Sequence, residues 1–270
     1  MTDLVLDLNA ISQAAVQSDN TSVDSSGFVK EIAVEGPTLC RIREYVELGR
    51  HAPSAAGALK GWKPALKGYL VIELLHKKHI QEMGDKLVPH EVKIFFNKAA
   101  KATSNYKKLF KQINAATGGS AQTFVDLVGK PFKAKVVHNV VGTGEDAKTY
   151  VNLENYDTPQ RENDDGDLVD IVVPELMGKV RLFLWENASV SDEQVAAMWE
   201  SIYNDRTYTK NAGKDNETEE SMNWDQEKIM AGLDWEDSRT KQIVASDDID
   251  LGDAPEMPEE TVQSNDEVDF

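Results

Sequence analysis

Lysines, arginines and aromatic residues alternate along several segments between residues 41 and 150. Cations of this kind can track the phosphates of a single nucleic-acid strand, and aromatic rings can stack on its bases at about 1–3 kcal/mol per base. Most of these side chains fall on one phase of the predicted strands, so we expect them to form one binding face. The expected DNA-binding residues are Arg41, Arg43, Tyr45, Arg50, Lys60, Trp62, Lys63, Lys67, Tyr69, Lys93, Phe95, Lys133, Lys135 and Tyr150.

Each of these residues also has a simpler interpretation. Strand surfaces carry Lys for solubility and Tyr for its β-propensity. Trp62 stands out, because it lies beside Lys63 in a loop of small residues and has no obvious core to enter. A slip of one residue exchanges the two faces of a strand. Phe95 and Phe96 are therefore interchangeable candidates, as are Phe132 and Lys133.

The chain shows no recognisable catalytic or metal-binding pattern. Gly142 and Gly144 join two predicted strands with no helix behind them, so they do not form a phosphate-binding loop. His76 and His79 have no carboxylate or Cys at ligand spacing, and the single Cys40 lies in the apolar phase of a strand. We expect no enzymatic activity, no cofactor and no metal site.

Five segments have the pattern of strands. Around residues 40–48, Cys40, Ile42, Val46 and Leu48 share the inward phase, and Glu44 interrupts it as a bulge would. Leu70, Ile72 and Leu74 are expected to face inward from the second strand, and Val92, Ile94 and Phe96 from the third. The other four strands are predicted at residues 67–76, 91–97, 129–139 and 148–156, the last two joined as a hairpin by residues 140–147.

A helix is predicted between the third and fourth strands. Ser104 can cap it, apolar residues follow at helical spacing, and Gly118 and Gly119 end it. Its lysines, Lys107, Lys108 and Lys111, are expected on a solvated face. Three strands, a helix and two strands is the arrangement of the OB-fold. The predicted fold is therefore mainly β, a five-stranded OB-fold barrel with its helix between strands 3 and 4.

A small α/β extension is predicted beyond the barrel. Residues 162–167 form a polar linker, residues 180–186 a short strand and residues 189–203 an amphipathic helix with Ser191 and Gln194 at its start. Residues 209–221 are expected to be disordered, and residues 223–235 to form a last short helix. Helices this short are unstable alone, so we expect them to pack on the barrel or on a neighbouring molecule.

The net charge of −18 is distributed unevenly. Residues 28–156 hold about 20 Lys and Arg against about 12 Asp and Glu, whereas residues 157–270 hold about 9 against about 31. This asymmetry indicates a basic binding body with an acidic tail. The predicted organisation is a disordered N-terminus (1–27), the OB-fold domain (28–160), the C-terminal extension (161–245) and a disordered acidic tail (246–270) that ends in Phe270.

Several stretches resemble the OB-fold single-stranded DNA-binding proteins of tailed bacteriophages. They are CRIREYVELGRHAP, KGYLVIELL, VPELMGKVRLFLWE, NWDQEKIMAGLDWEDS and, most specifically, GKPFKAKVVHN with KTYVNL. The resemblance implies binding of single-stranded DNA without strong sequence preference in phage replication, recombination and repair. It also implies that the acidic tail docks on replication proteins such as a polymerase, a helicase or primase, or a nuclease. The implied partner-binding residues are Asp266, Glu267, Val268, Asp269 and Phe270.

The tail departs from the bacterial pattern at Asp269, where bacterial single-stranded DNA-binding proteins have Pro. This difference favours phage-encoded partners over those of the host. The alternative function is a protein-interaction adaptor or scaffold whose barrel binds a peptide or a protein. No apolar run approaches the roughly 18–20 residues that span a membrane. We expect a protein of the bacterial host's cytoplasm that has no membrane partner and can form a homo-oligomer.

Overall fold

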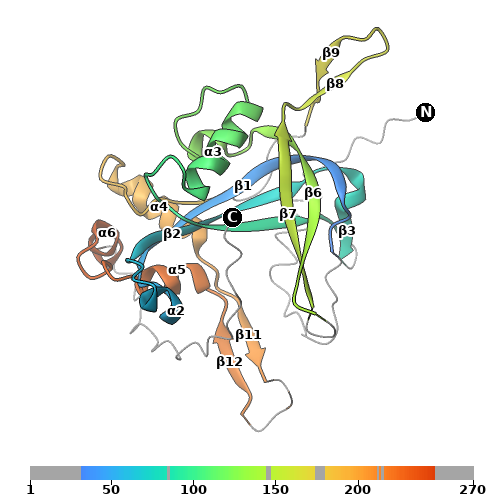
Figure 1. Ribbon diagram of the computed structural model, residues 1–270. Helices are drawn as coiled ribbons and strands as arrows, with labels where there is room; N and C mark the ends of the chain where they lie inside the picture. The colour runs from blue at the N-terminus through green and yellow to red at the C-terminus, as the bar shows by residue number, and fades with distance from the viewer. Residues whose placement is uncertain are drawn as a thin grey trace.

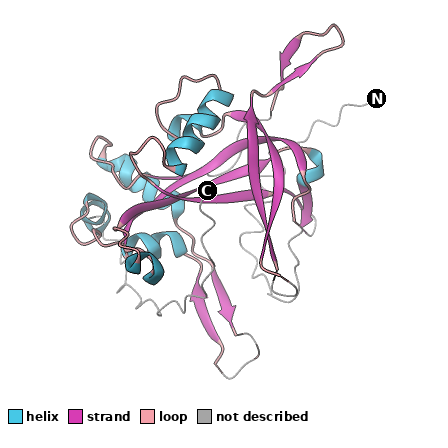
Figure 2. Ribbon diagram, viewed as in Figure 1, coloured by secondary structure: helices cyan, strands magenta, loops and turns pink. Residues whose placement is uncertain are grey.

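The protein is mainly β, built on one large antiparallel sheet with a few short helices (Figure 2). The computed structural model describes residues 32–83, 86–143, 147–173, 180–211, 213 and 216–246. The predicted disordered N-terminus and, beyond Ser246, the acidic tail with its docking residues lie outside the described residues. No helix in the described ranges is long and apolar enough to cross a membrane.

The central sheet has the strand order β5-β2-β1-β6-β7 (Figure 1). A short strand, β10 (Arg181–Phe183), adds to it by pairing in parallel with β1. Among the described residues, β5 pairs only with β2 and β7 only with β6, so no ladder joins the two edges into a closed barrel. The strands are β1 (Gly36–His51), β2 (Ala65–Leu74), β5 (Glu91–Asn97), β6 (Pro131–Val141) and β7 (Lys148–Asp157).

A β-bulge in β1 changes which side chains face the core. The pairing of β1 with β2 shifts register between Ile42 and Glu44. Before the shift Ile42 faces the first core, and after it Tyr45 does so, whereas Val46 and Leu48 face the opposite side of the sheet. The bulge at this point is confirmed. The inward phase predicted for Val46 and Leu48, and the outward phase predicted for Tyr45, are wrong because the extra residue exchanges the two faces.

The first core lies between the sheet and helix α3 (Asn105–Ala116). Ser104 caps α3, and its hydroxyl accepts a hydrogen bond from the backbone N–H of Lys107 at 3.3 Å. The predicted exposure of the helix lysines is confirmed. The predicted inward residues of β2 and β5 are also confirmed in this core, namely Leu70, Ile72, Leu74, Val92 and Phe96, with Ile94 partly buried against it.

The C-terminal extension packs on the other face of the sheet and forms a second core. The helices were predicted to pack either on the chain's own strands or on a neighbouring molecule. The structure shows that they cover the chain's own sheet. Trp199 of α4 (Asp192–Ile202) stacks on Trp235 with ring centroids 5.5 Å apart. The extension holds three described helices rather than the two predicted, because α6 (Arg239–Ser246) follows α5 (Trp224–Met230).

Several segments predicted as loops contain regular structure. The loop between β1 and β2 holds a short helix, α2 (Ala55–Leu59), and the polar linker is the turn of a hairpin in which Asn163 Oδ1 accepts two backbone N–H bonds. The stretch predicted to be disordered carries most of a second hairpin, where Lys210 pairs with Glu220. These strands are β8 (Gln160–Glu162), β9 (Leu168–Asp170), β11 (Thr207–Lys210) and β12 (Thr218–Ser221).

A further short hairpin between β2 and β5 was not predicted. It comprises the 3-10 turn η1 (Lys77–His79) with β3 (Ile80–Met83) and β4 (Lys86–Pro89). His79 is fully buried, and neither of its ring nitrogens has a hydrogen-bond partner in the described structure. Burial, together with the charges of Lys78, His90 and His76, lowers the pKa of His79 to about 4.

His79 makes the folded protein sensitive to mild acid. The unfolded chain takes up a proton at the ordinary pKa near 6.5, whereas the folded chain holds the ring neutral until about pH 4. Stability contributed by the neutral ring is therefore complete above about pH 6.5 and is lost as the pH falls towards 4. Between pH 7 and pH 5, protonation linked to this ring is expected to lower the free energy of unfolding by about 1–2 kcal/mol. His79→Leu should remove that decrease, and urea unfolding at the two pH values measures it. If the free energies of unfolding of variant and wild type fall equally with pH, His79 is not the source of the acid sensitivity.

Candidate nucleic-acid interface

The outer face of β5 presents an exposed aromatic ring beside a lysine. The register pairs Phe95 with Tyr69 and Lys93 with Val71 across β5 and β2. Phe95 is 69% exposed, and its ring meets Tyr69 edge-on with centroids 5.9 Å apart. Lys93 Nζ lies 3.6 Å from the Tyr69 ring centroid and 5.3 Å from that of Phe95. The predicted outward orientation of Lys93 and Phe95 is confirmed.

Lys93 is held against these rings and forms no ion pair within the described ranges. Burial lowers its pKa, and the negative charges of Asp225 and Glu44 oppose that shift. A cation fixed on aromatic faces without a carboxylate partner remains available to an incoming anion such as a phosphate.

The loop between β1 and β2 supplies a second aromatic ring. Trp62 packs over the backbone of Gly57, where an added Cβ would lie 2.5 Å from the ring. Lys60 Nζ lies 5.3 Å from the Trp62 ring centroid, and 40% of Trp62 remains exposed. Lys63 is exposed, and Lys67 is half-buried near the start of β2. The loop therefore keeps one ring and two lysines at the surface.

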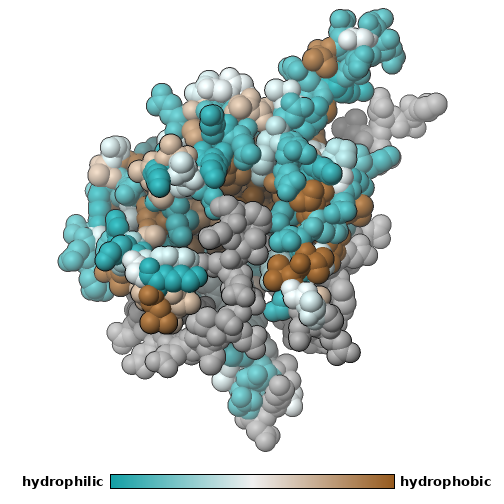
Figure 3. Space-filling view, in the orientation of Figure 1, coloured by the Kyte–Doolittle hydropathy of each residue, from teal (hydrophilic) through white to brown (hydrophobic). Residues whose placement is uncertain are grey.

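Three other predicted residues lie on the β6–β7 hairpin, on the far side of β1 from β2. Lys135 and Tyr150 are exposed, whereas Lys133 Nζ donates to the carbonyl of Gln160 at 2.7 Å. Figure 3 shows apolar surface on the lower part of this hairpin, where Val140 is exposed.

The predicted arginines are engaged within the protein. Arg41 is buried and pairs with Glu73 at 2.8 Å, so its predicted place on an exposed binding face is wrong. Arg43 contacts Glu91 at 2.6 Å. Arg50, about half exposed, contacts Asp234 at 3.0 Å. The first two ion pairs lie within the sheet, from β1 to β2 and from β1 across to β5, and the third joins β1 to the extension. All three engage cations that the sequence suggested for phosphate binding.

Tyr69 has its predicted orientation but not the exposure expected of a binding residue. It does point away from the first core, but the extension buries it completely. Its hydroxyl donates to Asp225 at 2.7 Å, and Arg181 contacts the same carboxylate at 2.5 Å. Tyr69 is therefore a support for Lys93 and Phe95 and not a free stacking surface. No pattern within the sequence around residues 181 and 225 signals this role.

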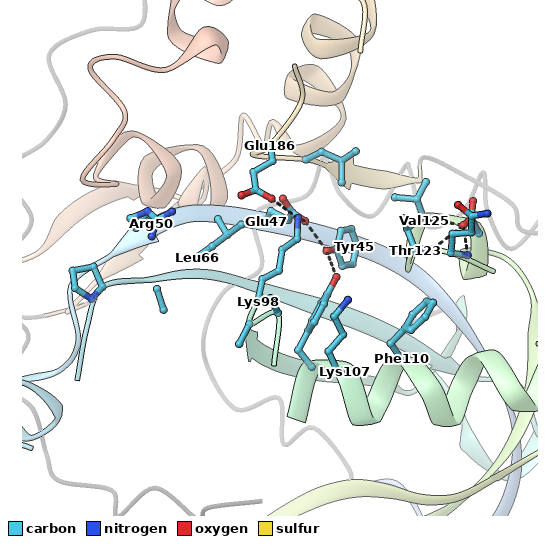
Figure 4. A pocket seen from close by; sticks show the side chains of 18 residues that line it. Tyr45, Glu47, Arg50, Leu66, Lys98, Lys107, Phe110, Thr123, Val125 and Glu186 are labelled. Atoms are coloured by element: carbon cyan, nitrogen blue, oxygen red, sulfur yellow. Dashed lines mark hydrogen bonds and ion pairs between the residues drawn. The ribbon is translucent and has the colours of Figure 1, made fainter. Parts of the chain in front are cut away.

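Tyr45 lies in the wall of a cavity of about 760 Å³ between β1, α3 and the segment after β10 (Figure 4). Its hydroxyl donates to Glu47 at 2.7 Å, and burial raises its pKa well above the ordinary value. Glu47 Oε1 also contacts Lys98 at 2.8 Å, and Lys98 reaches Glu186 at 3.0 Å. Tyr45, Glu47, Lys98 and Glu186 in the cavity wall are therefore already paired with one another.

A groove of about 630 Å³ separates the two edge strands β5 and β7. Helix α3 forms one wall, with Asn105, Lys108 and Gln112 on the face that lines it. Lys93 and Phe95 line the groove as well as the outer face of β5. Of the lining residues on α3, the sequence suggested only that Lys108 lies on a solvated surface. Within the described residues, no group of three His, Cys, Asp or Glu side chains is arranged to hold a metal.

Removal of the buried hydroxyl of Tyr45 is expected to destabilise the fold. Tyr45→Phe is expected to lower the free energy of unfolding by about 1–2 kcal/mol, because Glu47 loses a donor in a buried site. Tyr150→Phe is the matched control, since Tyr150 is exposed and is expected to change stability by less than about 0.5 kcal/mol. Chemical denaturation measures both variants. Equal effects would show that the Tyr45 hydroxyl contributes nothing specific.

No protein-family model matches the sequence, and no curated protein matches it either.

Proposed function

We propose that the protein binds single-stranded DNA without sequence preference, through the outer face of β5 and the loop between β1 and β2. The observation that carries this proposal is Phe95, an exposed ring on the edge strand β5, with Lys93 fixed beside it. An exposed phenylalanine supported by a buried tyrosine offers a rigid stacking surface, and the neighbouring lysine offers a contact for the phosphate.

The order of the strands supports the same face. The order β5-β2-β1-β6-β7, with α3 between β5 and β6 in the sequence, is that of an OB barrel opened between its third and fifth strands. OB-folds bind oligonucleotides on the face of strands 2 and 3 and with the loop between strands 1 and 2. In this chain those positions are β2, β5 and the loop that carries Trp62. We therefore propose a partly open OB-fold.

Stacking on Phe95 and Trp62 would tolerate any base, because every base has an aromatic face. The lysines of the face would release counterions from the strand, so affinity should fall steeply with salt. Duplex DNA keeps its bases stacked inside the helix and cannot use these rings. The combination favours single strands over duplexes.

The acidic residues 246–270 complete the proposed function. This stretch has no Lys or Arg and holds Val268 and Phe270 among its acidic residues, so we propose that it repels DNA and serves as a docking segment for basic pockets on replication proteins. We propose a role in phage replication, recombination and repair, in which the body covers single strands and the tail recruits partner proteins.

Phe95→Ala should weaken binding to labelled oligo-dT by about 1–3 kcal/mol, measured by gel shift over a salt series, because one stacking platform is lost. Trp62→Ala should act in the same direction. Leu168→Ala is the matched control, since Leu168 is also 69% exposed but lies on the β8–β9 hairpin, which projects away from the body (Figure 1). Absence of any salt-sensitive preference of the wild type for single strands would refute the proposal and favour the adaptor alternative.

Deletion of residues 246–270 should tighten binding to oligo-dT at low salt. A flexible chain of about 25 residues reaches roughly 25–30 Å, and we propose that an acidic segment of this length competes with DNA for the basic body. The gain should shrink as the salt concentration rises, because screening weakens that competition. Fluorescence anisotropy of full-length and truncated protein measures the effect. Unchanged or weaker binding at low salt would exclude competition by the tail.

A further inference from the structure

The groove between β5 and β7 leads directly from the proposed DNA-binding face. Lys93 and Phe95 line both surfaces, so a strand that stacks on Phe95 can continue over the edge of β5 into the groove. The groove volume of about 630 Å³ lies in the range of small-molecule sites. Two kinds of chain fit such a place, an extended peptide added to a strand edge or an unpaired segment of nucleic acid.

The strand edges are poorly suited to a peptide. β7 carries an extra residue, since its pairing with β6 shifts register between Lys133 and Lys135. Asn155 in the same stretch has a φ of 53°, a left-handed conformation that interrupts a regular edge. On the opposite edge, Lys93 is an exposed charge on β5. Bulges and edge lysines are the devices by which sheets resist the addition of another strand.

The lining of the groove suits a nucleotide better. Asn105, Lys108 and Gln112 recur at helical spacing on one face of α3, so the wall offers two amides and one cation. Lys93 and Lys108 outnumber the one carboxylate in the lining, Glu154. Side-chain amides both donate and accept hydrogen bonds, so they can pair with the edge of any base whose Watson–Crick partner is absent.

We propose that this groove takes an unpaired nucleotide of the bound strand, with its base against the amides of α3 and its phosphate at Lys93 or Lys108. The inference rests on the proposed function and adds a mechanism by which the protein distinguishes single strands from duplex DNA. The amides contact the base edges that a duplex hides, so the groove rejects paired DNA by its chemistry.

Photocrosslinking tests the proposal directly in the full-length protein. A benzophenone amino acid in place of Gln112 should crosslink labelled oligo-dT, and the same amino acid in place of Gln194 should not. Gln194 is the matched control because it is an exposed glutamine on α4, outside the groove. Crosslinking from Gln112 to another protein chain in place of DNA would overturn the proposal and identify a peptide or a second copy as the occupant.

Substitutions on α3 give an independent readout. Lys108→Ala should lower the slope of log affinity against log salt by about 0.7–1, whereas Lys111→Ala, exposed on the same helix but outside the groove, should leave it unchanged. Gln112→Ala should weaken binding about threefold to tenfold without changing the slope.

The outcomes separate the two proposals. If the wild type binds no single-stranded DNA, the proposed function fails. If it binds and Phe95→Ala weakens it, while Lys108→Ala behaves like Lys111→Ala and Gln112 yields no crosslink, only the groove proposal is overturned.

Discussion

The extra residue that β1 accommodates at Arg43 determines how the rest of the molecule is arranged. It turns Tyr45 into the core beneath α3 and sends Val46 and Leu48 to the opposite face. Both faces of β1 and β2 are then apolar, so both must be covered. Helix α3 covers one face, and the C-terminal extension covers the other. A sheet with a single buried face would have needed no extension.

Covering the second face restricts where a ligand can bind. The extension buries Tyr69 and fixes its hydroxyl through Asp225, which leaves β5 as the uncovered strand beside it. Lys93 and Phe95 therefore form a small surface supported from below by a side chain that is itself held in place. Rigid support of this kind reduces the entropy lost when a ligand binds.

The sequence predicted well what depends on local pattern. The alternation in β5 placed Phe95 and Phe96 on opposite faces, and Ser104 marked the start of α3. The sequence did not reveal which side chains pair with residues far away along the chain. Arg41 and Arg43 look like surface cations in the sequence, and only the fold shows that Glu73 and Glu91 neutralise them. The hairpins in the polar segments were missed because their strands are only three or four residues long, too short for an alternating pattern to be recognised.

The two-sided cover of β1 and β2 has a consequence for how the chain is made and handled. During synthesis the strands emerge before residues 180–246, so Val46, Leu48 and Val71 stay uncovered until the extension arrives. Each such side chain gains about 1.5–3 kcal/mol on burial. A fragment cut after the β6–β7 hairpin would expose this face permanently and associate through it. The shortest fragment that keeps this face covered therefore extends to the end of α6.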